Sequence, residues 1–322
     1  MKRKTIVITG AAGFIGSSLI KSLLKNKSEV FGIDNLTNNY DSAYKLANLK
    51  SLDQPNFHFY KLDILDKSGL TQFFTKTKPD AVVHLAALTG VRASLSQPEL
   101  YYEVNTRGTK IVYENAVQAR VKSFVFSSSS SIYGNQSQIP FSESLKPLPQ
   151  SPYAKSKADA ESLLKKLYLK HHLPTTVLRL FSVYGPHGRP DMAPYLFTQA
   201  AFTQTPISQY GDGASARDYT YIDDVVAAIL KTLTANLQWE IINIGNSSPV
   251  KLSELLKLVE KLTNKKIQRH ILPAQPAESN ITFADTSKAK GLLRWESKID
   301  FVIGMQKFVN WYKSVRLPQI RV

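Results

Sequence analysis

The sequence predicts an α/β fold in which a doubly wound parallel sheet carries a smaller C-terminal α/β lobe. Short β-branched runs alternate with amphipathic helical stretches through the first half of the chain. This alternation builds right-handed βαβ units around a parallel sheet. A glycine-rich turn joins the first run to the first helical stretch, and the alternation stops near Phe181, where a loop rich in glycine and proline begins.

Six strands are expected in the first half, because β-branched and apolar runs follow one another at helix-sized intervals. The fourth and fifth runs have apolar and β-branched centres, which is typical of strands covered on both faces. The strands are expected over residues 4–9, 29–34, 57–64, 80–87, 122–130 and 175–181. Between them, helical spacing of apolar residues predicts helices over 13–27, 70–77, 99–119 and 153–171.

The chain beyond the loop has a different texture, with short mixed elements over 193–204, 207–233 and 251–264. We therefore expect a first domain over residues 1–181 and, over 182–322, mainly a smaller lobe that binds a substrate. The apolar run near 241–245 is expected to return to the main sheet as a further strand.

Composition narrows the class of protein. The chain has 322 residues, a formal net charge of +16 and no cysteine. No apolar run reaches the ~18 residues that a membrane span needs, and the absence of cysteine fits a reducing compartment, so we expect a cytoplasmic protein without a membrane partner. The lysines are spread along the chain rather than clustered with aromatic residues, which disfavours a dedicated nucleic-acid surface.

The glycine-rich turn indicates a dinucleotide site. Gly10, Gly13 and Gly16 follow the first strand and open a helix, the arrangement of a Rossmann fold, in which a tight turn lets the backbone approach a pyrophosphate. Asp34 ends the second strand, 24 residues after Gly10. A carboxylate there accepts both ribose hydroxyls and repels a 2′-phosphate, which favours NAD over NADP. Asn35 beside it is neutral and tolerates either.

Tyr153 and Lys157 are the candidate catalytic pair. They are spaced i, i+4 and share one helix face, whereas Lys155 points elsewhere. A neighbouring ammonium lowers the pKa of a tyrosine from its usual ~10, and a tyrosine tuned in this way is a general base for a hydroxyl proton. Five serines, Ser127 to Ser131, follow the fifth strand. One of them is expected to share a substrate hydroxyl with Tyr153, and chemistry alone does not choose which.

In these motifs the chain resembles the extended short-chain dehydrogenase/reductases over nearly its whole length. The resemblance is carried by "TGAAGFIG", "HLAA", "SSSSSIYG", "SPYAKSK", "GDGASARDYTYIDDV" and "ADTSKAKGLL". Among them it is most similar to nucleotide-sugar epimerases of the UDP-glucuronate 4-epimerase type. The resemblance implies Ser129 as the catalytic hydroxyl and Tyr153 and Lys157 as the base and its lysine. It also implies that Asn105 lies near the active site.

The resemblance further implies a reaction and a set of cofactor contacts. Tyrosinate takes the proton of the sugar 4-hydroxyl, a hydride passes from C4 to a tightly held NAD, the 4-keto sugar turns in the site, and the hydride returns to its other face. No metal is expected. The expected cofactor contacts are Gly10, Gly13, Phe14, Ile15, Gly16, Asp34, Asn35, Asp63, Ile64, Leu85, Ala86, Ala87, Asn105, Tyr153, Lys157 and Phe181.

The sugar and the nucleotide are assigned by two further segments. Arg217 matches an arginine of the family that reaches the diphosphate, and the loop "SVYGPHGRPDMA" resembles the glucuronate type, with a hydroxyl at Ser182. The expected substrate contacts are Arg92, Ser129, Ser130, Tyr153, Ser182, Arg189, Tyr210 and Arg217. The chain departs from the family at His187, usually aromatic or glutamine, and at Pro276–Ser279, where "PAES" replaces "PGD".

Several alternatives stay open. The substrate is expected to be a UDP-sugar, and a UDP-glucose or UDP-N-acetylhexosamine epimerase is the main competing function. A UDP-glucuronate decarboxylase uses the same 4-keto intermediate. A 4,6-dehydratase is disfavoured, because Ser130 and Ser131 stand where it needs acids. A regulatory or RNA-associated protein that binds NAD would not need Tyr153 and Lys157. Amphipathic helices over 102–117 and around Tyr153 favour a homodimer.

Overall fold

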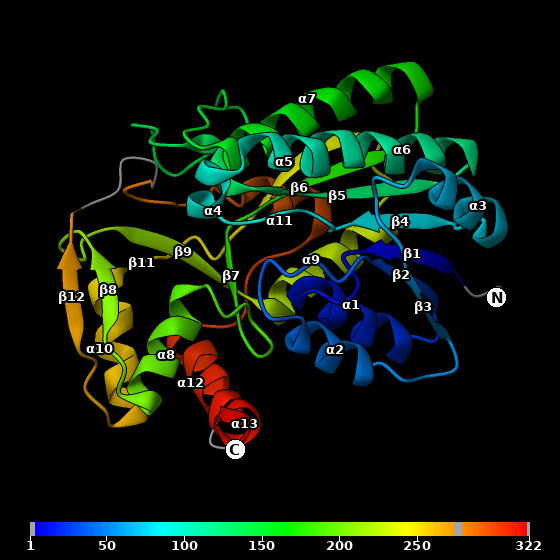
Figure 1. Ribbon diagram of the computed structural model, residues 1–322. Coiled ribbons are helices and arrows are strands. Elements are labelled where there is room, and N and C mark those ends of the chain that lie inside the picture. The colour runs from blue at the N-terminus through cyan, green and yellow to red at the C-terminus, as the bar shows by residue number, and fades with distance from the viewer. Residues whose placement is uncertain (1–3, 274–278, 321–322) are drawn as a thin grey trace.

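The computed structural model describes residues 4–273 and 279–320, and its centre is a parallel sheet of seven strands (Figure 1). The strand order is β10-β6-β5-β4-β1-β2-β3, and every neighbouring pair is parallel. This is the predicted doubly wound Rossmann sheet. The strands are β1 (Thr5–Thr9), β2 (Glu29–Asp34), β3 (Phe57–Lys61), β4 (Ala81–His84), β5 (Ser123–Ser129), β6 (Thr175–Leu180) and β10 (Trp239–Ile244).

Helices cover both faces of this sheet (Figure 1). In β1, Val7 packs into one apolar cluster with α3, α6 and α7, while Ile6 and Ile8 pack into another with α1 and α9, because successive side chains of a strand point to opposite faces. The helices around the sheet are α1 (Phe14–Lys25), α2 (Ser42–Lys50), α3 (Lys67–Thr77), α4 (Val91–Ser96), α5 (Pro98–Tyr102), α6 (Thr109–Gln118), α7 (Pro152–His171), α9 (Ile222–Thr234) and α11 (Ser287–Leu293).

A smaller lobe lies beside the carboxyl ends of the central strands (Figure 1). It contains a three-stranded sheet of order β11-β9-β7 and a two-stranded pair, β12-β8. Its core is continuous with that of the main sheet, since Leu255 and Phe308 belong to the same apolar cluster as Ile8. Its elements are β7 (Ser182–Tyr184), α8 (Ala193–Thr203), β8 (Ile207–Tyr210), β9 (Ala216–Tyr221), β11 (Pro249–Lys251), α10 (Leu252–Thr263), β12 (Arg269–Leu272), α12 (Phe301–Trp311) and α13 (Leu317–Ile320).

Two segments cross from the lobe region back to the main sheet. β10 lies next to β6 at the sheet edge, and α9 packs against α1 and β5. The chain after Phe181 therefore contributes to both parts of the molecule. In the described ranges, no helix combines the length and apolar character needed to cross a bilayer.

The structure corrects three expected elements. β3 and β4 end at Lys61 and His84, before the predicted ends, because Leu62 and Ile64 after β3 and residues 85–88 after β4 line the cavity described below. The expected helix over 99–119 is not uniformly α-helical, since a π-helical turn, η1 (Glu103–Gly108), separates α5 from α6. Such turns cluster at functional sites. In addition to these three, the structure contains α2, which was not predicted because its apolar periodicity is weak.

Candidate active site

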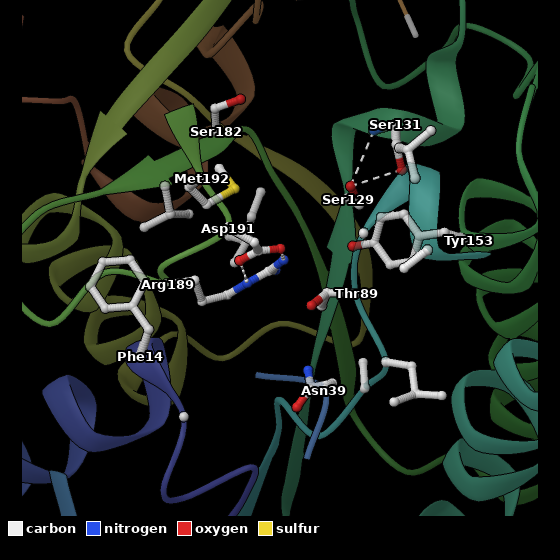
Figure 2. A pocket seen from close by; sticks show the side chains of 18 of the residues that line it. Phe14, Asn39, Thr89, Ser129, Ser131, Tyr153, Ser182, Arg189, Asp191 and Met192 are labelled. Carbon is white, nitrogen blue, oxygen red and sulfur yellow. Dashed lines mark hydrogen bonds and ion pairs between the residues drawn. The ribbon is translucent and has the colours of Figure 1, made fainter. Parts of the chain in front are cut away.

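A cavity of about 730 Å³ lies between the main sheet and the smaller lobe. It is lined by the loops that follow β1, β4 and β5 and by residues of β7, β8 and β9. This is the edge at which parallel α/β sheets bind their ligands. Figure 2 shows Ser129 and Tyr153 on one side of the cavity and the Arg189 side chain reaching in from the other.

The glycine loop forms one end of the cavity and fits a dinucleotide. Gly10 has φ +73°, and a side chain there would place its Cβ 2.8 Å from the backbone nitrogen of Ala86. Gly16 packs so closely on the backbone of Gly10 that a Cβ there has no room. Phe14 and Ile15, which line the cavity, open α1, where amides have no partner within the helix and point toward an anion.

Asp34, at the end of β2, lies beside the glycine loop and bonds to it. Its carboxylate accepts hydrogen bonds from the backbone N–H of Ala12 at 3.1 Å and of Leu36 at 2.8 Å. Lys45 of α2 lies 3.8 Å from the same carboxylate and donates to Thr37 at 3.0 Å. Burial lowers the pKa of Lys45, and Asp34 opposes this. Sequence reasoning missed Lys45, because nothing local connects it to Asp34.

Tyr153 and Ser129 face each other at the centre of the cavity (Figure 2). Tyr153 is half-buried, with its ring edge-on to Tyr101 at 6.2 Å between centroids. Burial raises the pKa of Tyr153, whereas the Ser129 hydroxyl and the Arg189 guanidinium lower it. The expectation that Lys157 produces a net lowering of this pKa is corrected here: in the protein alone, the loss of hydration outweighs the favourable contacts.

Lys157 lies one helical turn beyond Tyr153 and is only 3% exposed. Its Nζ donates to the backbone oxygen of Ser127 at 2.7 Å and lies 4.7 Å from the ring centroid of Phe126. Burial lowers its pKa to about 7, and the carboxylate of Glu161 opposes that shift. The ammonium is therefore held against the end of β5 and close to its point of titration.

The five serines have separate positions. Ser127 accepts from Lys157 through its backbone oxygen, and Ser128 donates its hydroxyl to Glu161 at 2.5 Å. The Ser129 hydroxyl accepts from the backbone N–H of Ser131 at 3.2 Å and from the Ser131 hydroxyl at 2.9 Å. Because both of these bonds are accepted, the proton of Ser129 remains available toward the cavity. Ser130 lines the cavity as well.

The loop before α8 supplies the opposite wall. Arg189 donates through Nε to Asp191 at 3.0 Å and through Nη2 to the second oxygen of the same carboxylate. The side chains are 21% and 51% exposed. Ser182 begins β7 and lines the cavity on the same side. His187, the unusual residue of this loop, lies behind it: its ring contacts Trp311 and bonds to Asn48 at 3.1 Å.

The far end of the cavity carries two further arginines. Arg217 lies on β9 and donates to its neighbour's backbone oxygen at 3.0 Å. Arg92 of α4 stacks on the ring of Tyr210 of β8, with 4.0 Å from its guanidinium carbon to the ring centroid. Arg92 and Tyr210 therefore join the main sheet's helices to the smaller lobe across the cavity.

Of the segment 276–279, which departs from the family, residues 276–278 lie outside the described residues.

The structure brings nearly all of the predicted site residues to this cavity, and two of the expected cofactor contacts lie outside its lining. Asp63 does not line it; its carboxylate accepts from Asn35 at 2.7 Å and from the backbone of Leu65. Asn105 is buried behind it, bonded to the backbone of Leu88 and to Ser156 of α7. Lining residues that sequence reasoning missed include Thr37, Asn39, Tyr40, Lys45, Thr89, Asp191, Met192, Ser208, Gln209 and Thr282.

Comparison with known proteins identifies relatives over nearly the whole chain. Residues 6–245 match the model of the "NAD dependent epimerase/dehydratase family". A UDP-glucuronate 4-epimerase of Thermodesulfobacterium geofontis is 42% identical over 311 residues, which are 96% of each chain. The crystal structure of a Bacillus cereus UDP-glucuronic acid 4-epimerase, in complex with UDP-glucuronic acid and NAD, superposes with a TM-score of 0.92 at 34% identity, covering 97% of this chain and 99% of that one. A Thermotoga maritima UDP-glucose 4-epimerase gives 0.89 at 31%, covering 96% and 98%.

Proposed function

The chain belongs to the NAD dependent epimerase/dehydratase family, and we propose that it is a UDP-glucuronate 4-epimerase, interconverting UDP-glucuronate and UDP-galacturonate. The single observation that carries the choice of sugar is the position of Arg189, which faces Ser129 and Tyr153 across the cavity. A cation that faces the catalytic serine and tyrosine across the cavity suits a substrate whose sugar carries its own carboxylate. The relatives with this activity support the same assignment.

NAD, held at the glycine loop and Asp34, supplies a reversible hydride acceptor for C4 of the sugar. Tyr153 acts as the general base for the 4-hydroxyl proton and returns that proton at the end of the cycle. The Ser129 hydroxyl donates a hydrogen bond to the 4-hydroxyl oxygen of the substrate. This bond holds the substrate oxygen within reach of Tyr153. Lys157 supplies the positive charge that stabilises tyrosinate.

The remaining predicted contacts hold the two ends of the substrate. Arg189 and Ser182 meet the sugar carboxylate, the first by charge-assisted hydrogen bonds and the second through a neutral hydroxyl. Arg217 binds the diphosphate and Tyr210 flanks the base. Arg92, expected from the sequence as a second cation near the sugar, stacks on Tyr210 at the same end. Firm attachment at the nucleotide leaves the 4-keto sugar free to turn, so that its other face meets the hydride.

The test is turnover on a panel of UDP-sugars with purified protein and no added cofactor. We expect conversion of UDP-glucuronate to UDP-galacturonate, with UDP-glucose a poor substrate. Tyr153→Phe should reduce kcat by about 10²–10⁴-fold, the usual contribution of a general base. Tyr168→Phe is the matched control, because it lies on the same helix away from the cavity. Preference for UDP-glucose, or release of carbon dioxide as the main outcome, contradicts the proposal.

We also propose that the enzyme works in the cytoplasm as a homodimer. The helical segment over 102–117 and α7 lie side by side on one face of the sheet (Figure 1), and Leu100, Tyr102 and Leu169 expose apolar surface there. Sedimentation analysis at micromolar concentration tests this: a dimer is expected, and a monomer contradicts it.

A further inference from the structure

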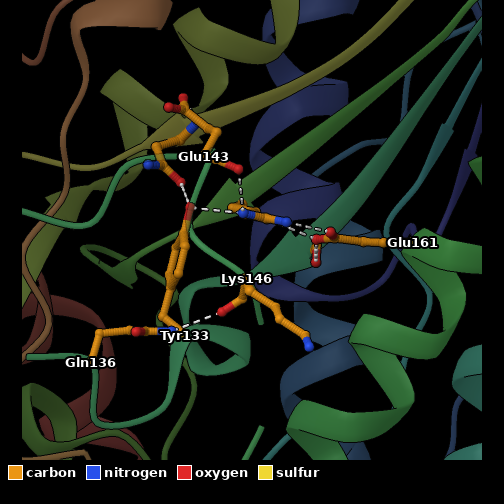
Figure 3. A network of polar contacts seen from close by, with 8 residues as sticks. Tyr133, Gln136, Glu143, Lys146 and Glu161 are labelled. Carbon is orange, nitrogen blue, oxygen red and sulfur yellow. Dashed lines mark hydrogen bonds and ion pairs between the residues drawn. The ribbon is translucent and has the colours of Figure 1, made fainter. Parts of the chain in front are cut away.

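A network of polar side chains extends from Glu161 to Tyr133 and Glu143 (Figure 3). At its centre, Arg179 of β6 makes two bonds to Glu161 of α7, from Nε at 3.1 Å and from Nη2 at 2.7 Å. Both side chains are almost fully buried, at 3% and 5% exposed. The guanidinium also donates to the hydroxyl of Tyr133 at 2.9 Å, which in turn donates to Asn243 of β10 at 2.7 Å.

This network is connected to the site through α7. Tyr153, Lys157 and Glu161 are spaced four residues apart and therefore share one face of the helix. That face contacts three consecutive serines of β5: Tyr153 meets Ser129, Lys157 bonds to the backbone oxygen of Ser127, and Glu161 accepts from the hydroxyl of Ser128. The helix thus fixes the end of the strand that presents the catalytic hydroxyl.

Resting on the proposed function, we infer that Glu161 is a positioning residue for this reaction: its carboxylate, paired with Arg179, anchors Ser128 beside Ser129 and places a negative charge one helical turn from Lys157. The geometry supports both parts. One carboxylate oxygen accepts from Ser128 and from Arg179, so strand and ion pair meet at one atom. Lys157 is buried with a neutral backbone oxygen as its acceptor, and Glu161 is the carboxylate that favours its charged form.

The other ionisable groups around Lys157 do not take this role. His84 of β4 is neutral, because burial and Lys157 itself lower its pKa to about 3. Tyr133 is protonated, since burial raises its pKa to about 12. Glu143 lies on the far side of Arg179 and accepts from the backbone of Asn243 at 2.8 Å. The groups that face the pair from the packed elements are Tyr153 on α7, Arg179 on β6, His84 on β4, Tyr133 in η2 (Ser130–Tyr133) and Glu143 in the following loop.

The decisive experiment compares two single variants that break the same ion pair. Glu161→Gln removes the negative charge and leaves Arg179 as a second cation near Lys157, so the pKa of Lys157 falls. Arg179→Gln removes one of the two cations near Glu161, so Lys157 becomes the remaining cationic partner of that carboxylate. The pKa of Lys157 therefore rises. We expect the alkaline limb of the kcat profile to move by about one pH unit, to lower pH in the first variant and to higher pH in the second.

A role in packing alone gives a different result, because both variants then lose stability and the limb stays in place. An unmoved limb, or movement in the same direction in both variants, therefore overturns the inference. Ultraviolet difference titration of each variant against the same variant carrying Tyr153→Phe gives a second readout without substrate. Tyr153 should ionise at higher pH in Glu161→Gln, because the ammonium that favours tyrosinate is lost earlier.

If the single variants do not fold, the double variant Glu161→Gln/Arg179→Gln removes both buried charges together and is the better tolerated change. Its alkaline limb should still move to lower pH, by less than in Glu161→Gln. A folded double variant with the parental limb overturns the inference. If no variant turns over any UDP-sugar while the parent does, retained NAD shows that the variant is folded, and the tyrosinate titration still reports the charge of Lys157. If the parent itself lacks epimerase activity, the proposed function fails, whereas the titration tests Glu161 separately.

Discussion

Two arginine–carboxylate pairs, whose arginines stand ten residues apart in the chain, differ in almost every physical respect. Arg179–Glu161 joins a central strand to a helix and is nearly inaccessible to water, whereas Arg189–Asp191 is formed within one loop and faces the cavity. The first arginine has further partners in Tyr133 and the backbone of Glu143. The second has a carboxylate two residues away that is half-exposed.

The difference separates a structural pair from an exchangeable one. A buried pair that has lost its hydration must keep every partner, because a lone charge in the interior is costly. A pair at the edge of a cavity, with a half-exposed carboxylate, keeps part of its hydration and is worth less to stability. Its guanidinium can therefore exchange one carboxylate for another, and an acidic ligand is the natural competitor for Asp191. Each experiment below tests this distinction, beginning with the largest expected effect.

Breaking the buried pair should destabilise the fold most. We expect Arg179→Met or Glu161→Ala to lower the free energy of unfolding by about 3–5 kcal/mol, because each leaves an uncompensated buried charge. Urea denaturation followed by circular dichroism measures this. The double variant Arg179→Met/Glu161→Met should recover most of the loss, and a double variant as unstable as the singles would show that packing rather than charge is responsible.

Breaking the cavity pair should affect binding instead. Arg189→Ala is expected to raise KM for UDP-glucuronate by about 10–100-fold, the equivalent of losing a charged hydrogen bond of roughly 1.5–3 kcal/mol. The free energy of unfolding should change by less than about 0.5 kcal/mol. Arg107→Ala is the control, because it removes an exposed arginine paired with Glu103 outside the cavity. Equal losses with UDP-glucose would place Arg189 at the nucleotide rather than at the sugar carboxylate.

Removing the competing carboxylate should act in the opposite direction. With Asp191→Asn, the guanidinium no longer shares its charge with a neighbour, so KM for UDP-glucuronate is expected to fall about threefold to tenfold, which corresponds to roughly 0.7–1.4 kcal/mol. Steady-state kinetics at low ionic strength measures the change, and added salt should reduce it. An increase in KM would mean that Asp191 orients Arg189 instead of competing for it.

An effect of similar, small size is expected at the neutral hydroxyl beside the pair. Ser182→Ala should raise KM for UDP-glucuronate by about fivefold, because a hydrogen bond of ~1 kcal/mol is lost without any change in charge. Ser182→Thr keeps the hydroxyl and serves as the matched variant. A Thr variant as impaired as the Ala variant would show that the hydroxyl itself makes no contact with the sugar.

A contrast between local spacing and tertiary contacts explains what could be predicted from the sequence. The glycine loop, Asp34 and the Tyr153–Lys157 pair could be predicted, because each is defined by spacing within one element or one βαβ unit. The roles of the five serines were not, since they depend on contacts with α7, which lies some thirty residues further along the chain. Asn105 was expected near the active site, and from η1 it bonds to Leu88 and to Ser156 of α7, behind the cavity lining.

Other omissions have equally physical causes. Lys45 lies on a helix with weak periodicity, and only the tertiary fold brings it to Asp34. Asp191 is an i, i+2 neighbour of Arg189 in the sequence, but this spacing alone does not predict that the carboxylate pairs with the guanidinium. His187 drew notice as an unusual residue of the loop, and the structure places it behind the cavity wall, against Trp311. Its exchange for another flat side chain is therefore a packing change.

The edge strand β10 has a consequence for how the chain is made. Its neighbour β6 ends at Leu180, but β10 begins only at Trp239, so the sheet lacks its last strand while that intervening length is synthesised. At ~5–20 residues per second, the incomplete sheet persists for several seconds on the ribosome. An exposed edge of this kind pairs readily with foreign strands. A fragment cut after residue 181 should therefore aggregate during expression, whereas one extending through α9 and β10 supplies its own closing strand.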